Sequence, residues 1–461
     1  MKKRLFTSLA ICLSTALVTT SVQASDQVPD KSIHSIAQQK VADTNFKVTE
    51  SGEALLDITA LALGVDWGKK GKESAVVTVK VDGNYVQDVV LFMGQEKFTY
   101  EVSLGHVSAG KHKVEVFLND EKSPDGVKKV IITKINVKTI PLTTEDALIY
   151  KYSPILYGRN LSEIPGNYEN NATDIPLLMY HKKSKDNVGN ITIEYSMIWS
   201  NEDGGTNTPA LMARWGRTTD IEWVYRVTLN PNGVILSEKY QGLNHATVPF
   251  TGVKEGHHPL LVTSTANNMV SQLDDPAVST GYRFFLNPAQ TLPENRTREV
   301  LMDANPWIYE IMAKEMNREE KVEKVADPNT PEISDQKNYL FIELNQQRKN
   351  SSAGTAISVK LKNDETLYTS NHDIPDWSIN RNGPAATTVE LPAGTDVNDI
   401  EVIKAVSVPI NNSLDYNIKL TNINRAFFLD KTYQPQSSFF QWDGEKTLTP
   451  EKPECILWNS N

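Results

Sequence analysis

The stretch AVVTVKVDGNY, residues 75–85, alternates valine with polar residues and ends in an Asp-Gly turn. Successive side chains of a strand point to opposite faces, so Val77, Val79 and Val81 share one face. An Asp-Gly pair after such a run is typical of a hairpin. The same alternation recurs in FTYEVSL (98–104) and KHKVEVFLND (111–120). This pattern predicts an antiparallel, immunoglobulin-like β-sandwich over residues 46–142.

Two further blocks of alternating residues follow. In residues 143–325 we expect a central β-sandwich with one helical segment at about 294–324, where Asn305 caps a helix that starts at Pro306. Residues 326–337 predict a linker by their Pro, Asp and Asn content. Residues 338–461 predict a C-terminal β-sandwich. The fold class is therefore mainly β, with three antiparallel sandwich-like domains. The strands expected in the central block are LLMYH (177–181), ITIEYSMIW (191–199), ALMARW (210–215), IEWVYRVTL (221–229) and VILSEKY (234–240).

The first residues predict export. A basic start, MKKR, precedes an apolar run and the small-residue site VQA, which predicts a signal peptide over 1–24, followed by a spacer over 25–45. Loss of three basic residues leaves 44 basic against 57 acidic residues, a net charge of −13. This balance argues against nucleic acid as a partner. No later segment is long and apolar enough to predict a transmembrane span. Cys455 would be the one remaining cysteine, so no intramolecular disulfide is expected.

The segment WSNEDGGTNTPALMARWGRTTDIEW, residues 199–223, concentrates carboxylates, arginines and tryptophans. Asp220 and Glu222 fall on one face of the expected strand, with Cα atoms about 6–7 Å apart. Two carboxylates at this spacing repel unless a cation or an arginine lies between them. Asp203 and glycine carbonyls could add oxygens to a calcium shell at this pair, since calcium takes about six to eight. The alternative is a salt-bridged loop in which Arg214 or Arg217 pairs with these acids.

Tryptophans supply the other candidate binding residues. Trp199 and Trp223 fall on the apolar faces of their strands and are predicted to lie in the core. Trp67 and Trp377 fall in loops, where their rings could stack on sugar rings. His245 is predicted to approach the acidic cluster. We find no nucleophile or phosphate-loop signature in the chain.

Residues 145–285 resemble the vacuolar protein-sorting-associated family and the necrosis-inducing cytolysins of plant pathogens. The elements that carry the resemblance are YKYSPILYG, TDIEWVYRVTL, YQGLNHATVPF and HHPLLVTSTANNM, in this order. The resemblance implies a calcium-binding β-sandwich in which Asp220 and Glu222 match the acidic pair and Asp203 an upstream loop aspartate. Ile221 replaces the tryptophan of the families' motif, and Arg217 and Thr218 stand where the cytolysins have histidines.

Together these features predict an exported protein of the periplasm or the medium that recognises a ligand without catalysis. The ligand would be a glycan, an envelope component or another protein, and calcium is the candidate cofactor. A membrane-active toxin-like protein is one alternative, which the resemblance implies. A polysaccharide hydrolase is another, with carboxylates drawn from Glu194, Asp220 and Glu222, since the separation of such a pair sets the mechanism.

Overall fold

The computed structural model describes residues 39–127, 129–142, 146–159, 175–202, 204, 206–276, 281–350 and 352–460. The predicted signal peptide and Asp203 lie outside these ranges. The described chain is mainly β, as predicted, and one compact unit spans Gln38–Asn461. No helix within the described ranges is long and apolar enough to cross a membrane.

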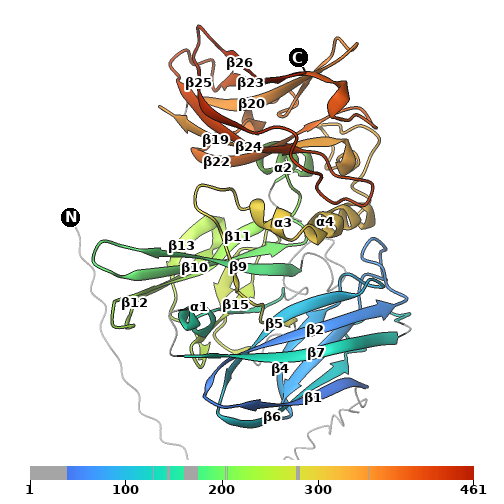
Figure 1. The fold of residues 1–461 in the computed structure, drawn as a ribbon, viewed down its shortest axis with the longest axis vertical. Helices are drawn as coiled ribbons and strands as arrows, with labels where there is room; N and C mark the ends of the chain where they lie inside the picture. Colours follow the sequence, from blue (N-terminus) through green and yellow to red (C-terminus); the bar gives the residue numbers. More distant parts are fainter. Residues whose placement is uncertain are drawn as a thin grey trace, which may run out of the picture. The chain divides into compact units, whose positions relative to one another are not determined.

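The first sandwich pairs a four-stranded sheet, in the order β1-β6-β3-β4, with a three-stranded sheet, in the order β5-β2-β7 (Figure 1). Val77 and Val79 are fully buried, as the alternation predicts. Residues 40–45 already belong to a strand, so the predicted spacer over 25–45 extends too far and the sandwich begins before residue 46. The strands are β1 (Lys40–Val48), β2 (Gly52–Leu63), β3 (Val76–Val81), β4 (Asn84–Val90), β5 (Phe98–Val107), β6 (Gly110–Leu118) and β7 (Lys129–Pro141).

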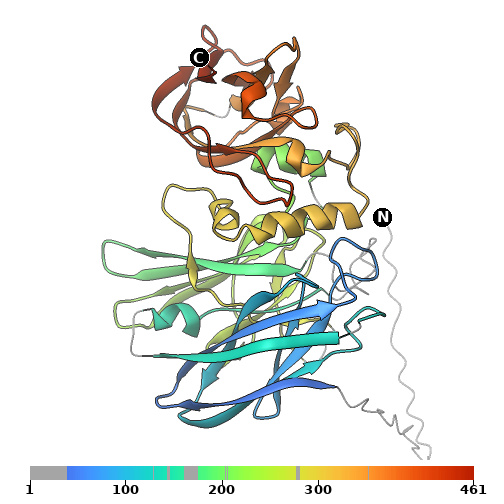
Figure 2. The ribbon, with the colours of Figure 1, turned by 45° about the vertical axis from the view of Figure 1, so that its right-hand side comes forward.

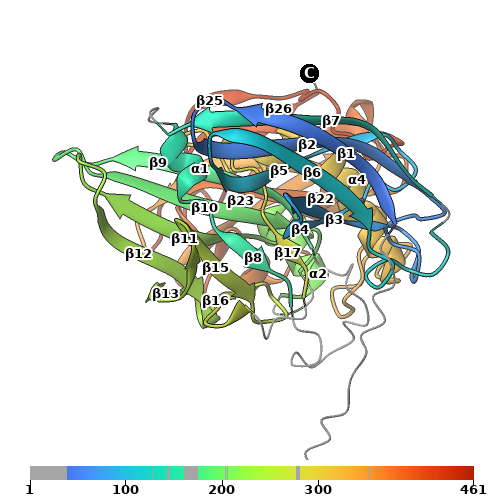
Figure 3. The same ribbon diagram turned by 90° about the horizontal axis from the view of Figure 1, so that it is seen from below.

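The central block contains two sheets. The larger runs in the order β13-β12-β11-β10-β9-β18, and Figure 3 shows β9 to β13 side by side. The smaller runs in the order β14-β15-β8-β17, with β16 paired to β15. The strands are β8 (Ile155–Tyr157), β9 (Pro176–Lys185), β10 (Ile191–Trp199), β11 (Ile221–Leu229), β12 (Ile235–Gly242), β13 (Ala246–Pro249), β14 (Lys254–Glu255), β15 (His258–Thr263), β16 (Val270–Gln272), β17 (Arg283–Phe284) and β18 (Gln290–Thr291). The helices of this block are α1 (Ala147–Lys151), α2 (Thr208–Trp215), the 3₁₀ turn η1 (Leu243–His245), α3 (Val300–Ala304) and α4 (Trp307–Arg318).

Helix α2 corrects the prediction of a strand over 210–215. Pro209 stands at its start and Gly216 ends it in the left-handed conformation, with φ 67° and an N–H donated to Met212 O at 3.0 Å. These are ordinary start and stop signals of a helix. Residues 210–213 are all buried, because α2 lies between the central block and β22. A fully buried short run does not distinguish a helix from a strand, so the capping residues were the better signal.

The predicted helical segment forms two helices, α3 and α4. The amide of Asn305 bonds Gln290 and Leu301 O instead of capping α4, which is a correction to the predicted cap. Pro306 stands at the N-cap and the helix proper starts at Trp307. In Figure 2, α4 runs below the third sandwich, and its buried face comprises Ile308, Tyr309, Ile311, Met312, Ala313, Glu315, Met316 and Arg318.

The C-terminal sandwich pairs two four-stranded antiparallel sheets, in the orders β22-β19-β24-β25 and β21-β20-β23-β26. Ile333 and Ser334 of the predicted linker are fully buried, so this connection packs against the body of the protein. The strands are β19 (Tyr339–Arg348), β20 (Ala353–Leu361), β21 (Leu367–Thr369), β22 (Gly383–Glu390), β23 (Ile400–Pro409), β24 (Ile418–Phe427), β25 (Trp442–Leu448) and β26 (Glu454–Asn459). Three 3₁₀ turns complete it: η3 (Gln336–Asn338), η4 (Pro375–Trp377) and η5 (Val397–Asp399).

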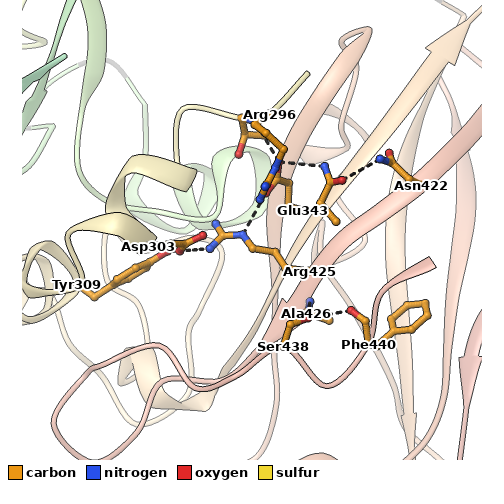
Figure 4. Close-up of polar contacts among 11 residues, drawn as sticks. Arg296, Asp303, Tyr309, Glu343, Asn422, Arg425, Ala426, Ser438 and Phe440 are labelled. Carbon is orange, nitrogen blue, oxygen red and sulfur yellow. Dashed lines mark hydrogen bonds and ion pairs between the residues drawn. The ribbon is translucent and has the colours of Figure 1, made fainter. Parts of the chain in front are cut away.

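The third sandwich is joined to α3 and α4 by aromatic and ionic contacts. Phe341 and Phe427 stack with ring centroids 5.2 Å apart, and the Tyr309 ring of α4 meets both edge-on. Glu343, which is fully buried, accepts from Arg296 at 3.0 and 2.9 Å and pairs with Arg425 at 3.2 Å (Figure 4). Arg425 also pairs with Asp303 of α3. This charged cluster fixes the segment before α3 against the third sandwich.

Candidate functional site

A cleft of about 630 Å³ lies where the central block meets the C-terminal sandwich. Its walls come from the connection between β10 and α2, the end of α2, the start of β11, and β12 with η1. The segments before β16 and before α3, and the chain leading into β22, complete them. Of the candidate residues from the sequence, Asp220, Glu222 and His245 line it. The other lining residues are Glu202, Thr206, Trp215, Arg217, Ile221, Trp223, Gln241, Asn267, Leu292, Arg296, Thr297, Arg298, Glu299, Arg381 and Pro384.

A β-bulge places Trp223 in this cleft. Tyr225 pairs with Tyr195 and Trp223 with Ser196, so one residue of β11, Val224, has no counterpart on β10. The extra residue reverses the alternation, and Trp223 lies on the face opposite to Tyr225. The prediction that Trp223 is a core residue is therefore wrong, because the side chain is half-buried and Arg226 lies 4.4 Å over its ring. Trp199, by contrast, is fully buried as predicted.

Asp220 and Glu222 each accept a hydrogen bond from an amide. Asn268 donates to Asp220 at 3.1 Å, and Gln241 donates to Glu222 at 2.9 Å. Asp220 is buried, whereas the Glu222 side chain is 17% exposed. No group of three His, Cys, Asp or Glu side chains within the described ranges could hold a metal ion. A calcium ion at this pair stays a prediction, and it depends on Asp203, which lies outside the described residues.

Arginines face these acids, but the predicted pairs change. The carboxylate that pairs with Arg217 is Glu299, at 2.8 Å, and both side chains are almost fully buried. Burial alone would raise the pKa of Glu299, yet Arg217 holds it below the usual value. Arg298 lies 3.7 Å from the Glu222 carboxylate and donates to Ile221 O. The arginine at Glu222 is thus Arg298, which sequence proximity could not suggest.

Glu202 stands in the connection between β10 and α2 and lines the cleft. Its carboxylate accepts from the Thr206 N–H at 3.0 Å. Burial raises the pKa of Glu202, and the nearby Glu222 carboxylate adds to this rise, while Thr206 and Arg217 oppose it. Two carboxyl groups with different environments therefore line one cleft. Glu202 was not a candidate from the sequence, since a single glutamate in a polar loop carries no signal.

His245 lies on the rim of the cleft, as predicted for a residue close to the acidic cluster. Its Nδ1 is 2.8 Å from Gln241 Nε2 and 3.7 Å from Glu222 Oε1. Asn244 and His245 both have positive φ, 56° and 58°, in the tight turn between β12 and β13. The turn leaves the His245 side chain 59% exposed, so it is available to a ligand.

The two loop tryptophans lie outside the cleft. Trp67 is 1% exposed, donates from Nε1 to Glu315 at 2.9 Å and contacts Arg318. It joins the first sandwich to α4 and does not present an exposed ring, contrary to the expectation for a sugar platform. Trp377 is half-buried in η4, where its ring meets His372 edge-on at 5.9 Å.

Comparisons with known proteins identify no family. No protein-family model and no curated protein matches this chain. Solved structures show only distant likeness. The sugar-binding C-terminal domain of EclA is 15% identical, over 22% of this chain and 68% of that one, with a TM-score of 0.17. A family two carbohydrate esterase from Clostridium thermocellum, in complex with cellohexaose, is 12% identical, over 28% and 34% of the two chains, with a TM-score of 0.15.

A GH2 β-galacturonidase from Eisenbergiella tayi, bound to galacturonate, is 12% identical over 48% of this chain and 31% of that one, with a TM-score of 0.15. Scores this low carry no argument about fold or ligand. None of these three is a cytolysin or a sorting protein, and the resemblance of residues 145–285 to those families stays a prediction.

Proposed function

We propose that this protein is an exported glycan-binding protein and that the saccharide binds in the cleft between the central block and the C-terminal sandwich. The observation that carries the proposal is the combination of residues in the cleft. Two half-buried tryptophans, Trp215 and Trp223, line it together with carboxylate, guanidinium, amide and imidazole groups.

A saccharide needs both kinds of group. Its C–H faces stack on aromatic rings, and its hydroxyls bond to polar groups held in fixed positions. Here the polar groups are held by one another: Gln241 bonds both Glu222 and His245, and Arg217 is bound by Glu299. A volume of about 630 Å³ is in the range of small-molecule sites and accommodates a short oligosaccharide.

The proposal is tested by expressing the full chain in a bacterial host and isolating the protein from the periplasm and the medium. N-terminal sequencing of that protein checks cleavage after Ala24. A glycan array then identifies saccharides that bind, and calorimetry compares the parent with Trp223→Ala and Trp377→Ala. We expect Trp223→Ala to weaken binding at least about tenfold, as for loss of a hot-spot tryptophan, and Trp377→Ala to leave it unchanged.

Trp377 is the matched control, because it is also half-buried but lies outside the cleft. Binding that is lost in Trp377→Ala and kept in Trp223→Ala would place the site on η4 instead. An array without any bound saccharide would contradict the proposed function itself.

A second candidate, hydrolysis of a glycan, is favoured by Glu202 and Glu222. Both carboxyl groups line the cleft, and burial holds the pKa of Glu202 above its usual value. Glycosidases use two carboxyl groups in different environments, one of them with a raised pKa. If the protein is such an enzyme, products should form from a bound glycan, and Glu202→Gln should abolish them while binding persists. If the Glu202→Gln variant still releases products from the glycan, Glu202 is not the catalytic acid.

A further inference from the structure

Resting on the proposed function, we propose that the cleft selects acidic saccharides, whose carboxylate or sulfate group binds Arg381 while a sugar ring lies against Trp215. The proposal starts from the balance of charges in the cleft. Four arginines line it: Arg217, Arg296, Arg298 and Arg381.

Three of these arginines have carboxylate partners. Arg217 pairs with Glu299 at 2.8 Å and Arg296 with Glu343 at 2.9 Å, and Arg298 lies 3.7 Å from a Glu222 oxygen. Their charges are therefore already balanced inside the protein, and they form fixed walls of the site.

Arg381 differs from the other three. Within the described part of the chain, no Asp or Glu oxygen lies within 4 Å of its guanidinium, and its Nη2 donates to Ala386 O at 3.3 Å. Burial lowers the pKa of Arg381 to about 10. Arg217 and other nearby arginines also lower it, whereas Glu299 raises it. An arginine stays protonated at neutral pH even so. Arg381 is half-buried, and a half-buried cation with no carboxylate within 4 Å gains a counter-ion when a ligand brings an anion.

The surroundings of Arg381 indicate which anion fits. Its guanidinium lies 5.8 Å from the ring centroid of Trp215, and Arg214 lies 4.2 Å from the same ring. Arg214 also has no carboxylate within 4 Å among the described residues, although Asp376 and Glu202 act on it electrostatically. A planar guanidinium binds a carboxylate or a sulfate through two parallel hydrogen bonds. An aromatic ring beside it suits a sugar that carries this group.

The arrangement depends on the docking of α2 against β22. Thr387 and Thr388 donate their hydroxyls to Ala213 O and Met212 O, at 2.6 and 2.9 Å, near the end of α2. Gly216 has a φ of 67°, and a Cβ there would lie 3.2 Å from Thr387 N, so the backbone conformation and the close approach both favour glycine. These contacts bring Trp215 of the central block beside Arg381 of the C-terminal sandwich.

The experiment uses matched pairs of oligosaccharides that differ only in charge. Oligogalacturonates are compared with their methyl esters, and sulfated galactan fragments with their desulfated forms, by calorimetry on the full-length exported protein. We expect the acidic member of at least one pair to bind at least about tenfold more tightly, since hydrogen bonds to charged groups carry this much. The pair whose two members differ in affinity shows whether the cleft binds a carboxylate or a sulfate.

Arg381→Gln should reduce the ratio of the acidic to the neutral affinity to about one. Arg348→Gln is the control, because Arg348 belongs to the same sandwich, has no carboxylate within 4 Å among the described residues and lies outside the cleft. If Arg381→Gln fails to fold, the salt dependence of the parent serves instead: acidic members should lose affinity with added salt and neutral members should not.

Equal binding of acidic and neutral members, or a preference that survives Arg381→Gln, would overturn this inference and leave the proposed function standing. If no saccharide on the glycan array binds the parent, the proposed function fails and this inference fails with it.

Discussion

Replacement of Glu343 by glutamine should destabilise the protein by more than any exposed substitution. Glu343 is fully buried and accepts from Arg296 Nε and Nη2, from Thr297 N at 3.0 Å and from Asn424 at 3.1 Å. Arg425 lies 3.2 Å from it (Figure 4). Glutamine keeps the shape but removes the charge, so Arg296 loses its carboxylate and Arg425 retains only Asp303.

Removal of one partner from a buried ion pair costs about 3–5 kcal/mol. We expect the lower end of this range, because the Arg296 side chain is 32% exposed and water can partly solvate it. Residues 38–461 form one compact unit of 424 residues. At about 2.1 cal/mol/K per residue, the entropy of unfolding is about 0.9 kcal/mol/K, so a loss of about 3 kcal/mol should lower the midpoint by about 3 °C.

Differential scanning calorimetry measures this change directly. Glu445→Gln is the matched control, since Glu445 pairs with Lys419 at 3.0 Å on the surface, where its side chain is 60% exposed. An exposed pair contributes about 1 kcal/mol at most, so this variant should shift the midpoint by about 1 °C or less. Equal midpoints for the two variants would refute the reasoning that the buried cluster holds the third sandwich to the segment before α3.

Three further predictions concern single side chains. Burial raises the pKa of Glu202, so its contribution to stability is present below pH 4.5 and is lost as pH rises through the raised pKa. Glu202→Gln should therefore be more stable than the parent at pH 7 but not at pH 4. Unfolding midpoints measured from pH 4 to pH 7 check this. Trp67→Phe leaves the buried Glu315 without its indole donor and should cost about 1–3 kcal/mol by denaturant titration, whereas Trp377→Phe should cost much less. If calcium binds at Asp220, saturating calcium at about 100 times the dissociation constant should add about 2.7 kcal/mol over EDTA, and Asp220→Ala should abolish the shift.

Local patterns predicted much of this fold. Alternation identified β10 and β11 within a residue of their ends, and Pro306 identified the start of α4 within one residue. These patterns are readable because each strand or helix presents one face to a core, and the face repeats along the segment itself. The acidic pair at Asp220 and Glu222 was located in the same way, since Asp220 directly precedes β11 and Glu222 is its second residue.

The cleft as a whole could not be read from the sequence. Trp223 lies on the face opposite to the one that alternation predicts, because β11 has one residue more than β10 at the bulge. The sequence of one strand does not show how many residues its partner places opposite it. Arg298 and Arg381 enter the site from segments far along the chain, placed there by α3 and by α2 docked on β22. The chain by itself thus determined which segments are strands and helices and where acids and tryptophans concentrate. Only the tertiary structure decided which charges are paired, because pairing depends on distances between elements that no local period encodes.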